Sequence, residues 1–148
     1  MIAVVQRVRE ASVTIAEPAY RAAIGAGLCV LLGVEDGDTE GDARWVAAKL
    51  ARLRIFRDDE DRMNRSVTDI GGSMLVVSQF TLAGDCSRGN RPSFVGAAAP
   101  AIGRRLYGLV CRLLREEHAL PVRTGRFGAM MDIALVNDGP VTVIVRKP

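Results

Sequence analysis

The sequence predicts a mixed α/β fold, built mainly from antiparallel strands and two helices. Apolar runs and apolar–polar alternation, both typical of strands, recur along most of the chain. Only residues 40–53 and 100–117 carry apolar side chains at the spacing of an amphipathic helix. Two helices are enough to cover one face of a sheet, and further strands can cover its other face.

Composition and charge are those of a globular protein. Hydrophobic residues make up 49% of the 148 residues and charged residues 25%, so we expect a single domain spanning residues 1–148 with a sizeable core. No apolar stretch reaches membrane-spanning length, and residues 1–7 lack the basic flank and apolar core of a signal peptide, which predicts a cytoplasmic protein. The net charge of +3 permits a polyanionic partner without requiring one.

The start of the chain predicts strands. Residues 2–8 favour a strand, and residues 11–15 alternate apolar and polar side chains as a half-buried strand does. A turn at residues 25–27 leads into residues 28–34, whose continuous apolar run is typical of a strand covered on both faces. The loop at residues 35–39 carries polar side chains that can cap a following helix.

The middle of the chain combines the first helix with further strands. The helix expected over residues 40–53 is followed by a short strand at residues 54–56. Residues 57–73 are polar and contain glycine, so we expect a long loop there. Residues 74–80 are expected to form a buried strand.

The last third begins with a second long loop, residues 83–97. A loop of that length without structure of its own is usually functional. Pro100 fits the first turn of the second helix. Three short pieces are expected to close the chain, the last two being strands joined by a turn: residues 121–124, 130–136 and 141–145.

A polar quartet, Ser78-Gln79-Phe80-Thr81, ends the apolar run that begins at Met74. Hydroxyl and amide groups are costly in a core unless they are hydrogen-bonded, and polar groups where a strand opens into a loop often form a site. Thr81 is a candidate nucleophile, although no histidine lies near it in sequence to activate it. Phe80 suits a binding pocket and core packing equally well.

The cysteines and the histidine suggest no reactive centre. Cys29 and Cys111 lie in apolar segments and are most simply small core residues. Cys86 lies in a polar loop, but a nucleophilic role would need a nearby base. The only histidine, His118, closes a charged helix end, where capping is the simpler interpretation. One histidine and scattered cysteines cannot supply the ligands of a zinc site, so we expect no metal.

A second motif occupies residues 137–142, Asn137-Asp138-Gly139-Pro140-Val141-Thr142. In isolation, Asp-Gly-Pro is typical of an ordinary tight turn. Paired with Ser78-Gln79-Phe80-Thr81-Leu82 about sixty residues earlier, it resembles the signature pair of the D-aminoacyl-tRNA deacylase family.

The resemblance extends over almost the whole chain. Further segments agree with the family in order: Ala3-Val4-Val5-Gln6-Arg7-Val8, Ala11-Ser12-Val13-Thr14, Leu31-Leu32-Gly33-Val34, Leu53-Arg54-Ile55-Phe56, Met63-Asn64, Arg91-Pro92-Ser93-Phe94 and Thr124-Gly125-Arg126-Phe127. One difference is Ala83-Gly84, where the family leads us to expect a pair such as Tyr-Ala. This difference is expected to alter the pocket rim and to leave the activity in place.

The resemblance implies a three-layer α/β/β, barrel-like fold and a homodimer. It implies hydrolysis of the ester between a D-amino acid, or glycine mischarged on tRNA-Ala, and the 3′-terminal adenosine of tRNA. Such a reaction is a proofreading step of translation. The family uses no metal or organic cofactor, and we expect neither a membrane nor DNA as a partner.

The resemblance also implies roles for individual residues. A Gly139-cis-Pro140 element would reach into the partner subunit's site, where a rigid backbone carbonyl leaves no room for an L side chain. Arg7 would anchor this element, although its sequence position alone suggests an ordinary charge at a strand end. Phe127 and Met131 would pack on the terminal adenosine, although both also suit a core.

The quartet would line the pocket, with its backbone N–H groups holding the ester carbonyl. The candidate catalytic residues are therefore Ser78, Gln79 and Thr81, with Phe80 as a binding residue. We favour attack by water, helped by these N–H groups and by the 2′-hydroxyl of the adenosine. Thr81 as nucleophile is the second hypothesis.

Two other functions remain open at the level of sequence. A related deacylase that removes L-alanine from the wrong tRNA would need a trans Gly139–Pro140 bond and a wider pocket. A non-catalytic RNA- or DNA-binding module would use a phosphate track of arginines. The candidate track comprises Arg88, Arg91, Arg104, Arg105, Arg123 and Arg126.

Overall fold

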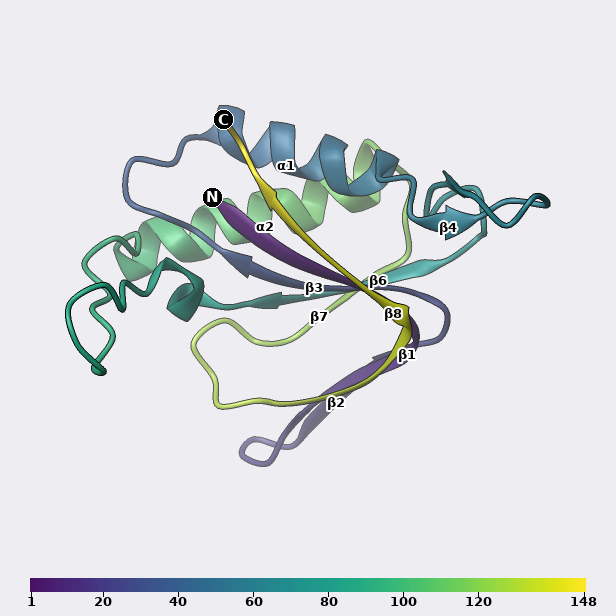
Figure 1. The fold of residues 1–148 in the computed structure, drawn as a ribbon. Helices are drawn as coiled ribbons and strands as arrows, with labels where there is room; N and C mark the ends of the chain where they lie inside the picture. The colour runs from purple at the N-terminus through teal and green to yellow at the C-terminus, as the bar shows by residue number, and fades with distance from the viewer.

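The computed structural model describes residues 1–148 and contains eight strands, two α-helices and one short 3₁₀ helix (Figure 1). In chain order the elements are β1 (Ile2–Ile15), β2 (Tyr20–Ile24), β3 (Gly27–Gly33), α1 (Glu40–Arg52), β4 (Phe56–Arg57), β5 (Met63–Arg65), β6 (Ser73–Ser78), η1 (Phe80–Ala83), α2 (Pro100–Glu116), β7 (Val122–Thr124) and β8 (Asp132–Arg146). The mixed α/β class predicted from the sequence is confirmed.

The long strand β1 organises the sheet. Its first half pairs with β3 and its second half with β2, while β8 pairs with it along most of its length, all antiparallel. The sheet continues from β3 through β6 to β7 by parallel pairing. Strands β4 and β5 form a separate two-stranded sheet.

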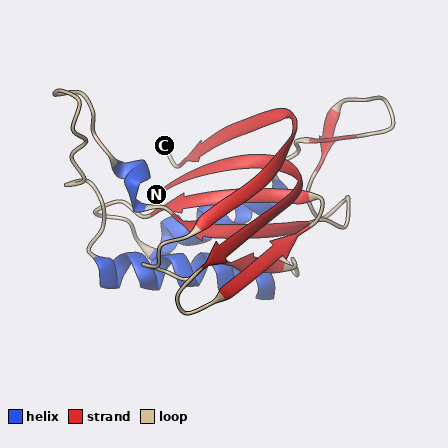
Figure 2. Cartoon of the chain, turned by 90° about the horizontal axis from the view of Figure 1, so that it is seen from below, coloured by secondary structure: helices blue, strands red, loops and turns tan.

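Two cores lie on opposite faces of this sheet. Helices α1 and α2 cover one face (Figures 1 and 2), and 27 buried residues from the helices and sheet form the larger cluster there. A smaller cluster of eight buried residues lies on the other face, where the second half of β1 and strand β2 fold back beneath β3 and β6. The result is the expected arrangement of one helical and two β layers.

One side-chain hydrogen bond joins the two outer strands of the main sheet path. The Tyr20 hydroxyl of β2 donates to the Thr124 carbonyl of β7 over 2.7 Å. Because β2 and β7 are the two outer strands of the main path, this contact leaves the sheet nearly closed, as a barrel is.

Both predicted helices are present, and each ends within one residue of the predicted end. At the start of α1, the Thr39 hydroxyl accepts from the backbone N–H of Asp42, while the Asp42 carboxylate accepts from the Thr39 N–H. This reciprocal cap satisfies N–H groups that lack intrahelical partners. Hydrogen bonds from Lys147 and Thr39 hold the pKa of the Asp42 carboxyl well below its usual range. Neither helix is long and apolar enough to cross a membrane.

The predicted strand boundaries were wrong in two places. Residues 2–8 and 11–15 belong to the single strand β1, because pairing with β8 continues past the exposed residues Arg9 and Glu10. Residues 130–136 and 141–145 likewise belong to one strand, β8, so the expected turn between them is absent.

Four further points of the predicted element order need correction. The strand expected over residues 74–80 ends at Ser78, and Phe80 begins η1. The long loop expected over residues 57–73 contains the short strand β5. Strand β2 was missed, and the short strand expected at residues 54–56 lies at Phe56–Arg57.

Candidate functional site

The polar quartet lies at the edge of a hollow of about 370 Å³. The backbone N–H of Gln79 donates to the Leu32 carbonyl over 2.8 Å, which extends the β6–β3 pairing one residue beyond β6. The chain then turns into η1, and this turn leaves the Phe80 side chain 58% exposed. The lining residues are Val77, Ser78, Gln79, Phe80, Thr81, Phe127, Gly128, Ala129, Met130, Met131 and Ile133.

No side chain that lines this hollow is titratable in the physiological range. The Thr81 hydroxyl oxygen accepts a hydrogen bond from the Gln79 amide over 2.5 Å, and no carboxylate, imidazole or amine lies among its neighbours in the hollow. Activation of a hydroxyl nucleophile needs such a base. The protein groups of this hollow therefore supply hydrogen bonds and shape.

His118 lies at the other end of the molecule. It follows the C-terminal end of α2, whereas the first turns of that helix lie beside the quartet. A helix of 17 residues is about 25 Å long, which puts His118 out of reach of Thr81 and of the loop that carries Cys86.

The remaining cysteines are core residues, as predicted. Cys29 and Cys111 are buried, and burial raises the pKa of each thiol to about 11. No group of three or more His, Cys, Asp or Glu side chains is placed to hold a metal ion.

Phe127 separates the hollow from a second, more apolar one of about 280 Å³ beneath α2. Its ring lies against Gly103 of the helix, where an added Cβ would stand 3.4 Å from the ring. The Arg104 guanidinium lies over the ring, 5.1 Å from its centroid. Phe127 thus packs against two neighbouring residues of α2, and it borders two adjoining hollows.

The segment Asp138–Val141 bulges out of the pairing between β8 and β1. Gln6 pairs with Thr142 and Val8 pairs with Asn137, so four residues of β8 stand opposite the single residue Arg7. The extra residues cannot all pair, and Pro140 has no N–H to donate. Gly139 and Pro140 are exposed, and the bond between them is cis, as the resemblance implies.

Arg7 holds this segment at its base. The side chain is 2% exposed, with Nε donating to the Asp138 carbonyl over 3.0 Å and Nη1 donating to the Ile55 carbonyl over 2.6 Å. The Asp138 carboxylate lies 3.3 Å from Nε. Arg7 is therefore a buried cation bonded to two backbone carbonyls and paired with a carboxylate, which corrects the alternative of an ordinary surface charge.

Gly139 is suited to its backbone conformation. Its φ of +139° lies in a region that residues with a side chain rarely adopt. A Cβ here would also approach the Val141 nitrogen to 2.9 Å. Across the segment, the Asn137 side chain accepts from the Val141 N–H over 2.8 Å.

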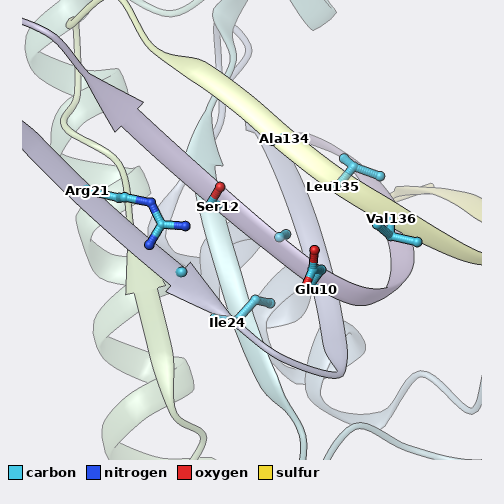
Figure 3. Close-up of a pocket in the computed structure, with 9 residues that line it drawn as sticks. Glu10, Ser12, Arg21, Ile24, Ala134, Leu135 and Val136 are labelled. Atoms are coloured by element: carbon cyan, nitrogen blue, oxygen red, sulfur yellow. The ribbon is translucent and has the colours of Figure 1, made fainter.

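A third hollow, of about 200 Å³, lies on the outer face of β1, β2 and β8 (Figure 3). Figure 3 shows Glu10, Ser12 and Arg21 around it, with Ala134 beside them on β8. No hydrogen bond joins the Ser12 hydroxyl to the Glu10 carboxylate, and the hollow shares no residue with the quartet. Nothing in it suggests chemistry.

Comparison with known proteins identifies the family. The chain matches the D-Tyr-tRNA(Tyr) deacylase family over residues 4–146. The chain belongs to this family.

Curated relatives agree with this assignment. The D-aminoacyl-tRNA deacylase of Chlorobaculum parvum is 57% identical over 148 residues, which cover 100% of this chain and 99% of the relative. The D-aminoacyl-tRNA deacylase of Deinococcus radiodurans is 59% identical over 143 residues, or 97% of each chain.

Two solved structures share the fold of the deacylase family. A c-Myc DNA unwinding element binding protein superposes with a TM-score of 0.90 at 39% identity, covering 100% of this chain and 99% of the other. A probable eukaryotic D-amino acid tRNA deacylase superposes with a TM-score of 0.81 at 18% identity, covering 97% of each chain. The second likeness supports the fold alone.

Most of the candidate residues for deacylase chemistry meet in one place. The quartet, Phe127 and Met131 all line the first hollow. Gly139, Pro140 and Arg7 do not: Gly139 follows Ile133, the last lining residue, by six residues of extended strand, or about 20 Å. Sequence reasoning missed the contact between Phe127 and Gly103, because nothing in the sequence signals a helix that approaches so closely.

Replacing Arg7 with Gln is expected to lower the free energy of unfolding by about 3 kcal/mol, because a buried carbonyl, a partly buried carbonyl and a carboxylate lose their donor. Urea denaturation of both proteins measures the difference. Arg9→Gln is the matched control: its side chain is 75% exposed and lies 3.7 Å from the same carboxylate. Its effect should stay within about 0.5 kcal/mol. Equal losses in the two variants would contradict the structural role given to Arg7.

Proposed function

We propose that this protein hydrolyses the ester that joins a D-amino acid to the 3′-terminal adenosine of tRNA. The observation that carries the proposal is the meeting of Ser78-Gln79-Phe80-Thr81 with Phe127 and Met131 in one hollow of a chain that belongs to the deacylase family. Relatives named D-aminoacyl-tRNA deacylase match it from end to end, which supports the same activity here.

The first hollow takes both the adenosine and the aminoacyl ester. The terminal adenosine packs against Phe127 and Met131, and the aromatic ring offers a face to the base. The aminoacyl ester then lies along Ser78 to Thr81, where η1 begins. The first N–H groups of a helix have no intrahelical partner, so those of Phe80 and Thr81 are available to the ester carbonyl as negative charge builds on it.

The attacking group is a water molecule. The hollow contains no side chain that could take the proton of a Thr81 hydroxyl or of a water. The 2′-hydroxyl of the adenosine stands next to the ester and orients the water in our mechanism. An aminoacyl ester is already activated, so positioning and carbonyl stabilisation by backbone donors suffice, without a metal or organic cofactor.

The active unit is a homodimer. Gly139 and Pro140 are exposed, and their own chain cannot bring them to the hollow. Strand β8 pairs only with β1, so one of its edges is free, and Ile144 on it is 66% exposed. An exposed strand edge with apolar side chains is a surface on which a second chain can pair or pack. A second copy of the chain would cover it and insert its own segment 138–141.

Chirality is selected by exclusion. A backbone carbonyl of the partner's Gly139 or Pro140 stands against the Cα of the bound amino acid, so an L side chain has no room and a D side chain points away. Glycine, having no side chain, is also accepted, which includes glycine mischarged on tRNA-Ala. Arg7 and Asn137 keep this segment in place through their bonds to Asp138 and Val141. The filter is strict about chirality and lax about side-chain identity.

The biological role that follows is proofreading in the cytoplasm. Hydrolysis frees the tRNA and keeps D-residues out of translation.

The relative named for binding a c-Myc DNA unwinding element supports a second candidate, a nucleic-acid-binding module without turnover. The exposed arginines near the hollow suit either function, and only turnover separates them.

Purified protein is expected to release D-tyrosine from D-tyrosyl-tRNA and to leave L-tyrosyl-tRNA intact, with rates that differ by on the order of 10² or more. Thin-layer separation of the freed amino acid measures both rates. Parallel reactions with L-alanyl-tRNA test the related deacylase that corrects L-alanine. A dimeric preparation that releases no D-tyrosine above the spontaneous rate would refute the proposed function.

Replacing Thr81 with Ala is expected to keep the single-turnover rate within about tenfold of the wild type, because the hydroxyl has no base to activate it. Rapid-quench measurement on D-tyrosyl-tRNA gives the rate. Thr81→Ser serves as control because it retains the hydroxyl. If Thr81→Ala loses about 10⁴-fold while Thr81→Ser remains active, the hydroxyl is the nucleophile and the water mechanism is wrong.

Two inactive variants should regain activity when they form a mixed dimer. Gly139→Ala distorts the segment, and Phe127→Ala removes the adenosine contact, so each homodimer is expected to be inactive. In a mixed dimer one hollow is intact and faces an intact segment, so random mixing should return about a quarter of the wild-type rate. Co-expression with two affinity tags isolates the mixed dimer. An inactive mixed dimer of two folded chains would contradict the shared site.

A further inference from the structure

We infer that four arginines around the hollow form a binding surface for the phosphates of the tRNA acceptor strand. The four are Arg88, Arg91, Arg104 and Arg126. The inference rests on the proposed function, because the strand that they bind is the one whose 3′ end enters the hollow.

These arginines lie on three segments at one end of the molecule. Arg88 and Arg91 belong to the loop after η1, Arg104 to the first turns of α2, and Arg126 to the loop between β7 and β8. In Figure 1 these segments gather at the end of the sheet where α2 begins. The same three segments surround or line the two hollows beside Phe127.

None of the four pairs with a carboxylate, whereas most other arginines do. Of the two other arginines in the track predicted from sequence, Arg105 bonds Glu40 over 2.7 Å, and Arg123 lies on strand β7. We retain the four arginines on the loops and on the first turns of α2, whose guanidinium groups form no ion pair with a carboxylate.

Acidic residues are sparse within these three segments themselves. Asp85 is the only acidic residue between residues 79 and 105, and none occurs between residues 119 and 131. The Asp85 carboxylate is itself engaged, accepting from the Ser87 N–H over 2.9 Å. A positive surface with few carboxylates in its own segments attracts a polyanion and guides its approach.

Two of the arginines are held by aromatic rings close to the hollow. The Arg104 guanidinium lies over Phe127, and that of Arg126 lies over Tyr20, 4.5 Å from its centroid. Such stacking leaves the guanidinium edge free to donate, and planar forks suit phosphate oxygens. We assign Arg104 and Arg126 to the phosphates nearest the 3′ end. Arg88 and Arg91, farther out on the loop, are assigned to phosphates upstream.

The test compares two substrates that share the same ester. One is D-tyrosyl-tRNA, and the other is adenosine esterified with D-tyrosine, which has no phosphate. Replacing all four arginines with Gln is expected to lower kcat/KM on the tRNA, relative to that on the adenosine ester, by about tenfold or more at 0.1 M KCl. The slope of log(kcat/KM) against log[KCl] should become shallower by about 0.7 for each lost contact.

A matched control removes the same positive charge elsewhere. Arg44, Arg52, Arg62 and Arg112 are exposed and lie on the helices or the β4–β5 hairpin, away from the hollow. Their replacement by Gln should leave the substrate ratio and the salt slope at the wild-type values. Thermal melting verifies that both quadruple variants fold.

The outcomes separate the possibilities. An unchanged substrate ratio and salt slope in the first variant overturn the inference, as does an equal change in the control variant. An equal loss on both substrates also overturns it, because the arginines would then act on the hollow itself and not through phosphates. If the wild type cleaves neither substrate, the proposed function fails. Filter binding of uncharged tRNA then decides the inference: weaker binding by the first variant alone supports it, and unchanged binding overturns it.

Discussion

The structure depends on one buried cation. Arg7 lies in the middle of β1 and bonds carbonyls from two other regions, Ile55 after the first helix and Asp138 in β8. A guanidinium buried without acceptors would be strongly destabilising, so these partners must assemble for the strand to pack. The same side chain occupies the place where four residues of β8 face one residue of β1. Arg7 therefore anchors the exposed segment 138–141 to the core.

Binding and chemistry use different kinds of residue in this molecule. The hollow beside the quartet is lined by apolar, amide and hydroxyl side chains. The free arginines stand outside it, on the loops and on the first turns of α2. In the proposed function, charge serves the long-range capture of a polyanion, while the hollow relies on shape and backbone donors. Because the arginines lie outside the hollow, no charged side chain has to be desolvated there.

The elements that could be predicted from the sequence are those determined by local residue patterns. The helices were predictable from the spacing of residues such as Val46 and Leu50 and from the Thr39 cap, and the quartet was recognised as the end of an apolar run. The continuity of β1 and β8 was not predictable, because Arg9, Gly139 and Pro140 interrupt the apolar pattern while the backbone remains extended through pairing between distant residues. The burial of Arg7 likewise depends on Ile55 and Asp138, which no local pattern connects to it.

Because no acid or base lines the hollow, the substitutions that abolish activity differ from those of a conventional hydrolase. A conventional hydrolase is silenced by one substitution at its base or nucleophile, and its pH optimum shifts with the environment of that group. In the proposed mechanism the lining offers no such group, so loss of function comes through lost packing or displaced backbone: removal of the Phe127 ring, a larger side chain at Gly103, a Cβ at Gly139, or a cavity beneath the strands that support η1. Under that mechanism, selection on this chain acts on the packing around the hollow.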